Sequence, residues 1–274
     1  MFFLKKNNAP AFLIIGAQKC GTSALHKYLS LHPRIVSPKG KEKKELHFFD
    51  FDERYNKGIS FYHSMFPNLK NKQITFDATP SYIFHKHVPK RIHEYNKEIK
   101  MICILRNPVE RAFSAWQMYK RNYEKDKDWL RKYVAHLGVT IRGNKRNEES
   151  YFSFHAFIEE EIDAASMGEQ LIDYSALERG QYAKQLRNYY NFFRKEQIFI
   201  CNTHDLRSRT KEVLDEIQQF LEIESYSYKP NEIVPLFEGN YCDVMEEKTR
   251  HLLDNYYKSH NRELFDLLHI DYGW

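Results

Sequence analysis

Apolar residues in this chain occur in short uninterrupted runs, and stretches with the spacing of amphipathic helices follow most of these runs. The clearest runs are Phe12–Ile15 and Met101–Leu105. Runs of this kind are typical of parallel strands that are buried on both faces of a sheet. We expect two further strands near Ile74–Phe76 and Gln197–Cys201.

Helical spacing predicts a first helix that follows the first strand and ends near Leu31. The further predicted helices cover Val88–Tyr95, the segment that begins at Pro108, Phe154–Ala165, Ala176–Phe193, Lys211–Leu221, Glu246–Lys258 and Asn261–Leu268. This alternation of strands and helices predicts an α/β fold, with a central parallel sheet flanked by helices on both faces.

The length of 274 residues suits one domain that spans residues 1–274 and can bury a large core. The segment 124–150 is charged and polar, contains two glycines and lacks a steady period. We interpret this segment as an insertion or a mobile lid, because long stretches without regular structure are uncommon in compact domains unless they have a function.

The segment Phe12–Pro33 joins the first strand to the first helix through a loop that contains glycine. Such a turn presents unpaired N–H groups and the positive end of a helix dipole, so it predicts an anion site, most simply for a phosphate. Gly16 and Gly21 have the spacing of a Walker A loop. However, Thr22 stands where that motif has lysine, and Lys19 lies inside the loop. The alternative is that the two glycines only form a turn.

A second candidate anion site follows the run Met101–Leu105. Arg106 lies at the carboxyl end of this strand, Pro108 suits the first turn of the next helix, and Ser114 falls within that helix. Ligands of open α/β sheets bind at the carboxyl ends of strands, so Arg106 is placed to pair with a second phosphate. A magnesium-dependent kinase needs an acidic residue here, which disfavours that function. The alternative for Arg106 is ordinary surface charge.

Five segments together resemble the sulfotransferases that use 3′-phosphoadenosine 5′-phosphosulfate (PAPS). The segment IIGAQKCGTSAL is similar to their 5′-phosphosulfate loop, and ILRNPVERAFSAW is similar to their 3′-phosphate strand and loop. The segments KKELHFFD, DATPSYIF and LERGQYAKQLRNYYNFFRKEQIFI resemble the branch that includes heparan sulfate sulfotransferases and many bacterial relatives. The resemblance runs from Phe12 to Trp274 and implies the sulfotransferase fold.

This resemblance implies that PAPS is the donor, that adenosine 3′,5′-bisphosphate (PAP) is the product and that no metal is needed. The cofactor-binding residues are then expected to be Gln18, Lys19, Cys20, Gly21, Thr22, Ser23, Arg106, Ser114, Tyr182, Tyr241, Lys248 and Arg250. We expect Lys19 to lie against the leaving phosphate, where negative charge grows during transfer. Preorganised donors of this kind usually supply the largest catalytic effect.

The acceptor must lose a proton, so the site also needs a base. In the resembling branch the glutamate of Glu-x-His-Phe-Phe has this role, and Glu45 occupies the matching position. We expect the apolar surroundings of Leu46, Phe48 and Phe49 to raise the pKa of Glu45. His47 is the alternative base, because histidine titrates near neutral pH. The plainest alternative is that Glu45 belongs to a solvated charged run.

The chain departs from the heparan-type enzymes at two places. Their Glu-Lys-Thr-Pro turn has a lysine that assists the sulfuryl group, whereas this chain has Ala78 between Asp77 and Thr79. Either Lys19 alone stabilises the sulfuryl group or another basic residue takes the role of the missing lysine. The change also weakens the case for heparan sulfate as the acceptor. The animal enzymes have a disulfide-closed loop near the carboxyl end, where this chain has only Cys242.

Composition adds limits on partners and compartment. The net charge of +5 is spread along the chain, which fits an anionic nucleotide and does not require nucleic acid. The four widely spaced cysteines are interpreted as reduced thiols. The apolar start MFFLKK is too short for a signal peptide, and no apolar run reaches transmembrane length. We therefore expect a cytoplasmic bacterial enzyme, and a homodimer is compatible with the sequence.

The predicted function is transfer of a sulfuryl group from PAPS to a hydroxyl of a small metabolite, such as a bacterial natural product, or of a glycoconjugate. An amine is the less favoured acceptor. Two alternatives stay open, a P-loop nucleotide kinase and a non-catalytic nucleotide-binding module with the same fold. Donor binding without magnesium distinguishes a sulfotransferase from the kinase, and formation of a sulfated product distinguishes it from the non-catalytic module.

Overall fold

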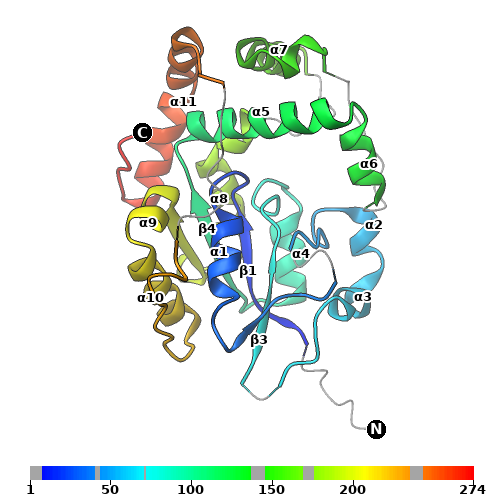
Figure 1. Ribbon diagram of the computed structural model, residues 1–274, viewed down its shortest axis with the longest axis vertical. Coiled ribbons are helices and arrows are strands. Elements are labelled where there is room, and N and C mark those ends of the chain that lie inside the picture. The colour runs from blue at the N-terminus through cyan, green and yellow to red at the C-terminus, as the bar shows by residue number, and fades with distance from the viewer. Residues whose placement is uncertain (1–7, 41–43, 71, 137–145, 169–175, 235–242) are drawn as a thin grey trace. The chain divides into compact units, whose positions relative to one another are not determined.

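In the described part of the chain, five parallel strands form a single sheet in the order β2-β3-β1-β4-β5 (Figure 1). The computed structural model describes residues 8–40, 44–70, 72–136, 146–168, 176–234 and 243–274. The strands are β1 (Pro10–Gly16), β2 (Ile35–Val36), β3 (Ile74–Ala78), β4 (Lys100–Leu105) and β5 (Ile198–Asn202). The prediction of an α/β fold with a central parallel sheet is confirmed.

The two apolar runs lie in the interior strands of this sheet. All side chains of Phe12–Ile15 and Met101–Leu105 are fully buried. Leu13 of β1 is paired with Asp77 of β3 on one side and with Met101 of β4 on the other. This position explains why both sequences are apolar without alternation, because helices cover both faces of a parallel sheet. The two-residue strand β2 is too short to be seen in the hydrophobic pattern.

The chain divides into two compact units, each described here by itself. The first unit comprises residues 1–105 and 188–238, and the second comprises residues 106–187 and 239–274. The first unit contains the whole sheet together with α1 (Thr22–Leu29), α2 (Asp52–Tyr55), α3 (Gly58–Ser64), α4 (Val88–Tyr95), the 3-10 turn η3 (Lys195–Gln197), α9 (Thr203–Ser208) and α10 (Thr210–Leu221).

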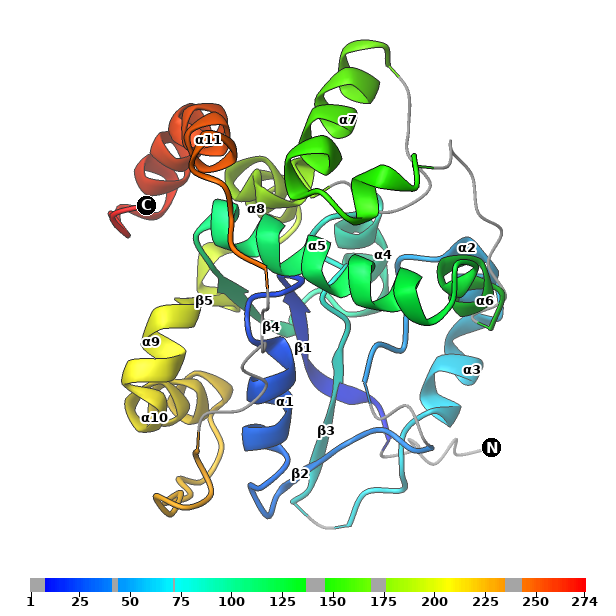
Figure 2. The same ribbon diagram turned by 45° about the horizontal axis from the view of Figure 1, so that its top comes forward.

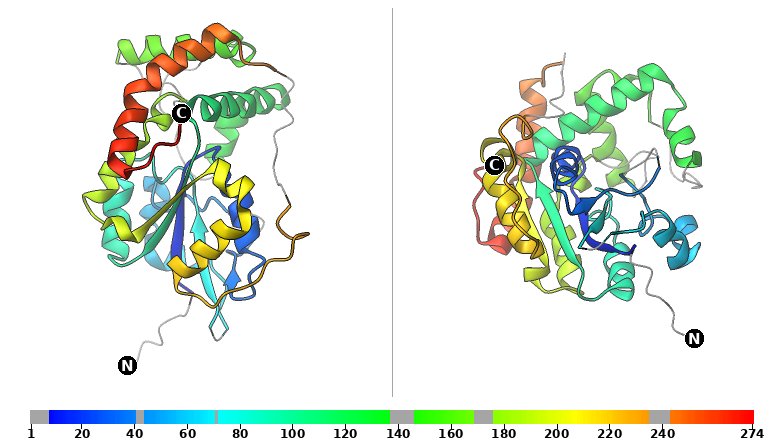
Figure 3. Two further views of the ribbon diagram at one scale, coloured as in Figure 1. Left: turned by 90° about the vertical axis from the view of Figure 1, so that its left-hand side faces the viewer. Right: turned by 60° about the horizontal axis from the view of Figure 1, so that its bottom comes forward.

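Helices α1 and α4 cover opposite faces of this sheet (Figure 3). From β1 the chain passes through α1 to the edge strand β2, on the β3 side of β1. From β3 it passes through α4 to β4, on the other side of β1. Right-handed crossovers that run in opposite directions put their helices on opposite faces. The carboxyl end of β1 therefore lies at the reversal of strand order, which is the usual place of ligand sites in such sheets.

The second unit is built from helices around its own apolar cluster (Figure 2). Its elements are α5 (Pro108–Lys125), α6 (Trp129–His136), the 3-10 turn η1 (Glu149–Tyr151), α7 (Phe154–Ser166), the 3-10 turn η2 (Glu178–Gly180), α8 (Tyr182–Tyr190), whose last residues belong to the first unit, and α11 (Glu247–Leu268). Phe113 and Trp116 of α5, Phe157 of α7 and Tyr257 of α11 are among the buried members of the cluster. Helix α5 is thus tied to both α7 and α11.

Two helical predictions need correction. The helices expected over Glu246–Lys258 and Asn261–Leu268 form one continuous helix, α11. No glycine or proline interrupts this stretch, and the polar residue Asn261 is buried rather than at a helix end. The helix expected over Ala176–Phe193 is shorter: residues 178–180 form the turn η2, Gln181 has a non-helical ψ of 63°, and α8 begins only at Tyr182.

The segment 124–150, expected to lack regular structure, contains part of α5, the helix α6 and part of η1 among its described residues. Residues 137–145 of it lie outside the described part of the chain. The assignment of this segment as an insertion or lid, and that of residues 1–274 as one domain, stay predictions.

Candidate active site

The loop 17–21 between β1 and α1, here called the phosphate loop, has the geometry of an anion site. Gly21 begins α1 with a φ of 99°, and a side chain there would lie 3.4 Å from Leu206 of α9. Within the described residues, the N–H groups of Gly21, Thr22 and Ser23 donate to no backbone carbonyl. These three donors at a helix start can therefore meet the oxygens of an anion.

Contacts inside the first unit fix this loop. The Thr203 hydroxyl, at the start of α9, lies 2.7 Å from the Cys20 carbonyl oxygen and 3.0 Å from the Leu105 carbonyl oxygen. The N–H of Cys20 donates to the carbonyl oxygen of Ala17 at 3.1 Å. The Cys20 amide is thus already paired, and the amides without a backbone partner among the described residues of this turn begin at Gly21. The Gln18 side chain is half-buried, and its carbonyl oxygen has no hydrogen bond within the described residues.

A second lysine, which the sequence did not single out, lies at the same helix start. Lys44 Nζ is 3.0 Å from Ser23 Oγ and 3.4 Å from Thr22 Oγ1. It also forms an ion pair with Glu45, at 2.9 Å from Oε1. The predicted base and the hydroxyl groups of α1 are thus joined through one ammonium group. Lys44 had no distinguishing signal in the sequence, because three other lysines lie with it in the charged segment 39–44.

Glu45, His47 and Asp50 form a short series of charged groups. His47 Nε2 lies 3.9 Å from Glu45 Oε2, and His47 Nδ1 lies 2.7 Å from Asp50 Oδ2. The Ser81 hydroxyl donates to the same Asp50 oxygen at 2.6 Å. The Glu45 side chain keeps 41 % of its surface exposed, whereas those of His47 and Asp50 keep 6 % and 0 %. Glu45 is therefore the member of the series that an acceptor can reach.

The charges in this series set the protonation states. Burial alone would raise the pKa of Glu45, but the Lys44 ammonium and His47 outweigh it, and the pKa is lowered. Burial would lower the pKa of His47, but Asp50 and Glu45 raise it. Burial would raise the pKa of Asp50, but the contact with His47 lowers it to about 2. The expectation of a raised Glu45 pKa is therefore wrong, because the flanking cations exceed the effect of the apolar neighbours.

The turn 77–80 holds the Glu45–His47 segment in place. The N–H of Glu45 donates to the Ala78 carbonyl oxygen at 2.9 Å, and the N–H of His47 donates to the Thr79 hydroxyl at 3.4 Å. The buried Asp77 carboxylate in turn accepts hydrogen bonds from the hydroxyls of Thr79, Tyr82 and Tyr62. This buried network explains why the Asp-Ala-Thr-Pro turn and the Glu-x-His-Phe-Phe segment occur together in one sequence.

Three of the predicted catalytic side chains share an unusual backbone. Lys19, Glu45 and His47 have φ values of 69°, 60° and 49°. Residues other than glycine adopt this left-handed region at a cost, and they do so most often where surrounding structure and function require it. Among the described residues, Lys72, Glu222 and His269 share this backbone, so the motif residues are three of six non-glycine residues with positive φ.

The second unit contains the residues predicted for the 3′-phosphate. Glu110 of α5 lies between two arginines, with Oε2 at 3.8 Å from Arg106 Nη2 and Oε1 at 2.7 Å from Arg250 Nη2. The Tyr182 hydroxyl donates to the Arg106 carbonyl oxygen at 2.9 Å. Arg106, Tyr182 and Arg250 are therefore brought together within this unit, and Ser114 is buried on α5.

The other two residues predicted for the nucleotide outside the phosphate loop are Lys248 and Tyr241. Lys248 is exposed and pairs with Glu246 at 3.1 Å. Tyr241 lies outside the described residues, as does Cys242. The residues predicted for the 5′-phosphosulfate and for the base, from Gln18 to His47, belong to the first unit.

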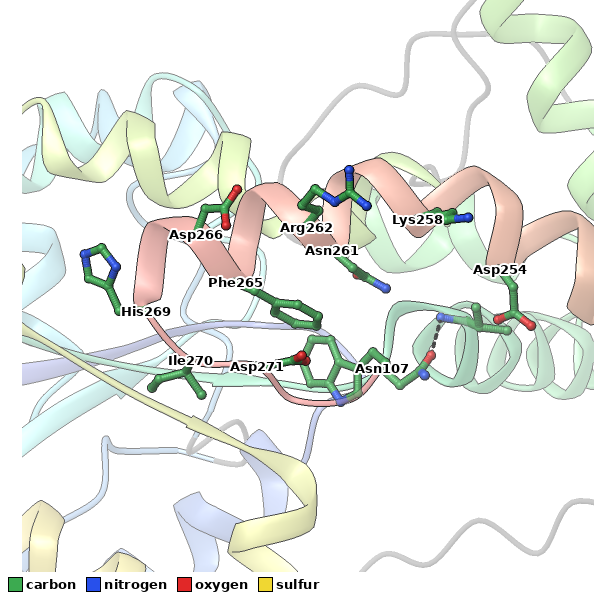
Figure 4. A pocket seen from close by; sticks show the side chains of 12 residues that line it. Asn107, Asp254, Lys258, Asn261, Arg262, Phe265, Asp266, His269, Ile270 and Asp271 are labelled. Atoms are coloured by element: carbon green, nitrogen blue, oxygen red, sulfur yellow. Dashed lines mark hydrogen bonds between the residues drawn. The ribbon is translucent and has the colours of Figure 1, made fainter.

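A cavity of about 700 Å³ in the second unit is lined by the second half of α11 and the carboxyl-terminal residues (Figure 4). Its lining includes the aromatic residues Phe265 and Trp274, and charges of both signs such as Arg262 and Asp266. None of the predicted catalytic or nucleotide-binding residues that the structure describes lines this cavity. We therefore place the candidate active site at the phosphate loop and not here.

The described residues were compared with the requirements for a metal site and for a membrane-spanning helix. They contain no cluster of three or more His, Cys, Asp or Glu side chains arranged to bind a metal ion. They also contain no helix that is long and apolar enough to cross a membrane.

Comparison with known proteins identifies relatives along most of the chain. Residues 9–262 match the sulfotransferase domain family. The chain is 30 % identical to heparan sulfate glucosamine 3-O-sulfotransferase 5 of Homo sapiens, over 85 % of this chain and 59 % of the relative. It is 28 % identical to the membrane-associated sulfotransferase kil1 of Dictyostelium discoideum, over 97 % of this chain and 66 % of the relative. The chain thus spans less than two thirds of the length of either protein.

A solved structure gives the same result for the fold. A sulfotransferase from Alicyclobacillus acidocaldarius superimposes with a TM-score of 0.68 at 24 % identity, over 96 % of this chain and 97 % of that chain. The match of the domain family, the similarity to curated sulfotransferases and the shared fold agree with the motifs read from the sequence. This chain belongs to the sulfotransferase family.

Proposed function

We propose that this protein transfers the sulfuryl group of PAPS to a hydroxyl group of a small metabolite or a glycoconjugate, with Glu45 as the general base. One observation carries the proposal. Glu45 is joined through Lys44 to the Thr22 and Ser23 hydroxyls at the start of α1, so an ionised carboxylate faces a ready anion site. A nucleotide-binding module without catalysis would not need a carboxylate there.

The residues of the chain fit the chemistry of this donor. The N–H groups of Gly21, Thr22 and Ser23 can hold the 5′-phosphate, and Lys19 can stabilise the charge that develops on it. The resemblance assigns the 3′-phosphate to Arg106 and Ser114, and the proximity of Arg250 to Glu110 adds a further cation to that group. PAPS would supply an activated sulfuryl group, and the protein supplies cations in place of a metal.

The proposed reaction breaks the S–O bond between the sulfuryl group and the 5′-phosphate, and it forms an S–O bond to the acceptor oxygen. The electron pair of the broken bond stays on the phosphate of PAP. The acceptor proton passes to Glu45, which is ionised at neutral pH because Lys44 and His47 lower its pKa. Asp50 and Glu45 raise the pKa of His47, which favours its protonated form and makes it the weaker candidate for the base.

The test is transfer of label from ³⁵S-PAPS in the presence of EDTA. Two acceptor pools are supplied, an extract of the source cells and desulfated heparan-type oligosaccharides, and mass spectrometry identifies the product and locates the sulfate on oxygen or nitrogen. We expect a labelled product from at least one pool. If label is transferred to neither pool and calorimetry detects no binding of PAP, the proposed function is wrong. A reaction with γ-³²P-ATP and magnesium serves as the control for a kinase.

A further inference from the structure

The turn 77–80 lacks a cation that the resembling heparan-type enzymes have. Ala78 occupies the position of their lysine, and its side chain is fully buried at the end of β3. Its carbonyl oxygen accepts the N–H of Glu45 at 2.9 Å, so the residue at position 78 is a direct neighbour of the predicted base. A cation that replaces the missing lysine must therefore come from a residue close to Glu45.

Lys44 meets this requirement by its geometry. The ammonium group has three N–H donors, and three oxygens lie around it, Glu45 Oε1 at 2.9 Å, Ser23 Oγ at 3.0 Å and Thr22 Oγ1 at 3.4 Å. Two of these oxygens belong to the first turn of α1, where an anion is expected, and the third belongs to the base. The ammonium group therefore lies between the phosphate-binding hydroxyls and the carboxylate.

This intermediate position matters because the sulfuryl group also passes between a phosphate and a base. During transfer it leaves the 5′-phosphate and reaches the acceptor oxygen, whose proton goes to Glu45. The Lys44 side chain keeps 19 % of its surface exposed, so a ligand can reach it although most of it is shielded from water. A shielded ammonium forms stronger hydrogen bonds to a charged ligand than an exposed one does.

We propose that Lys44 binds the sulfuryl group of the donor and replaces, from the neighbouring segment of the chain, the lysine that Ala78 lacks. The inference rests on the proposed function, because it takes PAPS as the donor. On donor binding, the N–H groups that Lys44 directs at the Ser23 and Thr22 hydroxyls turn to the sulfuryl oxygens, and the contact with Glu45 is kept. Lys19 then serves the leaving phosphate, and Lys44 serves the group in transfer.

The test compares two nucleotides that differ by the sulfuryl group alone. Affinities for PAP and for PAPS are measured by calorimetry, without an acceptor and at low temperature, with chromatography to check that PAPS stays intact. Lys44→Met should weaken PAPS binding by about tenfold or more, since a hydrogen bond to a charged group is worth about 1.5–3 kcal/mol. Its affinity for PAP should change less than about threefold. Lys44→Arg, which keeps the charge, should bind PAPS more tightly than Lys44→Met.

Lys39→Met is the matched control, because Lys39 is exposed on the same segment, and its ammonium lies 3.4 Å from the Ser64 carbonyl oxygen rather than at the start of α1. It should leave both affinities unchanged. Circular dichroism reports folding, and Lys44→Gln is a second neutral variant should Lys44→Met unfold. Equal loss of PAP and PAPS affinity in a folded variant would overturn the inference, and so would unchanged PAPS affinity. If the wild-type chain binds neither nucleotide, the proposed function fails instead.

Discussion

Replacement of Glu45 by glutamine tests the assignment of the base most directly. Glutamine keeps the size of the side chain and its carbonyl oxygen can still accept from Lys44, but it cannot take up a proton. The Glu45 side chain is 41 % exposed, and among the described residues it is joined to the start of α1 through Lys44, so donor binding should persist. A general base contributes roughly 10²–10⁴-fold in rate, and we expect Glu45→Gln to slow transfer by at least about a hundredfold.

The pH dependence adds a second measurement. Lys44 and His47 lower the pKa of Glu45, so the wild-type rate should stay constant from neutral pH downward and fall only below the ordinary range of a glutamate. If His47 were the base, the rate would instead rise with pH through a pKa above the ordinary value of histidine, because Asp50 raises it. The two assignments therefore predict that the transfer rate falls at different pH values on the acid side of the profile.

The assay follows ³⁵S transfer at saturating PAPS over this pH range, with PAP affinity measured in parallel. Three results together would refute the reasoning: near-normal turnover of Glu45→Gln, an inactive but folded His47→Ala, and a rate that falls on the acid side through a pKa above the ordinary value of histidine. The base would then be His47. The family assignment would still stand, because it depends on the domain match and not on the base.

Three further predictions concern neighbouring groups. Arg106→Ala and Ser114→Ala should each weaken PAP binding by about tenfold or more while leaving AMP binding nearly unchanged, since each removes a partner of the 3′-phosphate; equal affinity of the wild type for AMP and PAP in calorimetry would contradict that assignment. Lys19→Ala should lower turnover far more than PAP affinity, because its main partner is charge that develops in the transition state; equal losses in kinetics and calorimetry would make it a plain phosphate anchor. Asp50→Asn should lower the free energy of unfolding in urea near pH 6. Because Asp50 raises the pKa of His47 in the folded state, this difference is full below the ordinary pKa of histidine and should shrink as the pH rises through the raised value; a difference that grows toward pH 9 would show that the ion pair is not its cause.

The sequence allowed much of the fold and of the phosphate loop to be predicted. Uninterrupted apolar runs identified β1 and β4, because only strands covered on both faces are apolar at every position. Gly21 located the start of α1, where the φ of 99° favours glycine. These features are local, so a single segment carries the whole signal.

The parts that could not be predicted are those that depend on contacts between distant segments. Lys44 looks like any other lysine of a charged run, and only the fold brings it to Ser23. The sign of the Glu45 pKa shift was wrong because apolar neighbours are visible in the sequence, whereas the positions of the Lys44 and His47 charges are not. The sequence shows that Asp50 is three residues from His47, but the burial of Asp50 and its contact with the histidine depend on tertiary structure.

The left-handed backbone at Lys19, Glu45 and His47 has a consequence for protein engineering. Each such residue costs on the order of 1–3 kcal/mol relative to a relaxed conformation, and glycine adopts this region freely. A mutational scan scored by protein abundance should therefore tolerate or favour glycine at these three positions, while the same scan scored by sulfate transfer should reject it. Stabilising substitutions chosen without an activity screen would tend to remove the predicted catalytic side chains first, which is the usual conflict between stability and activity.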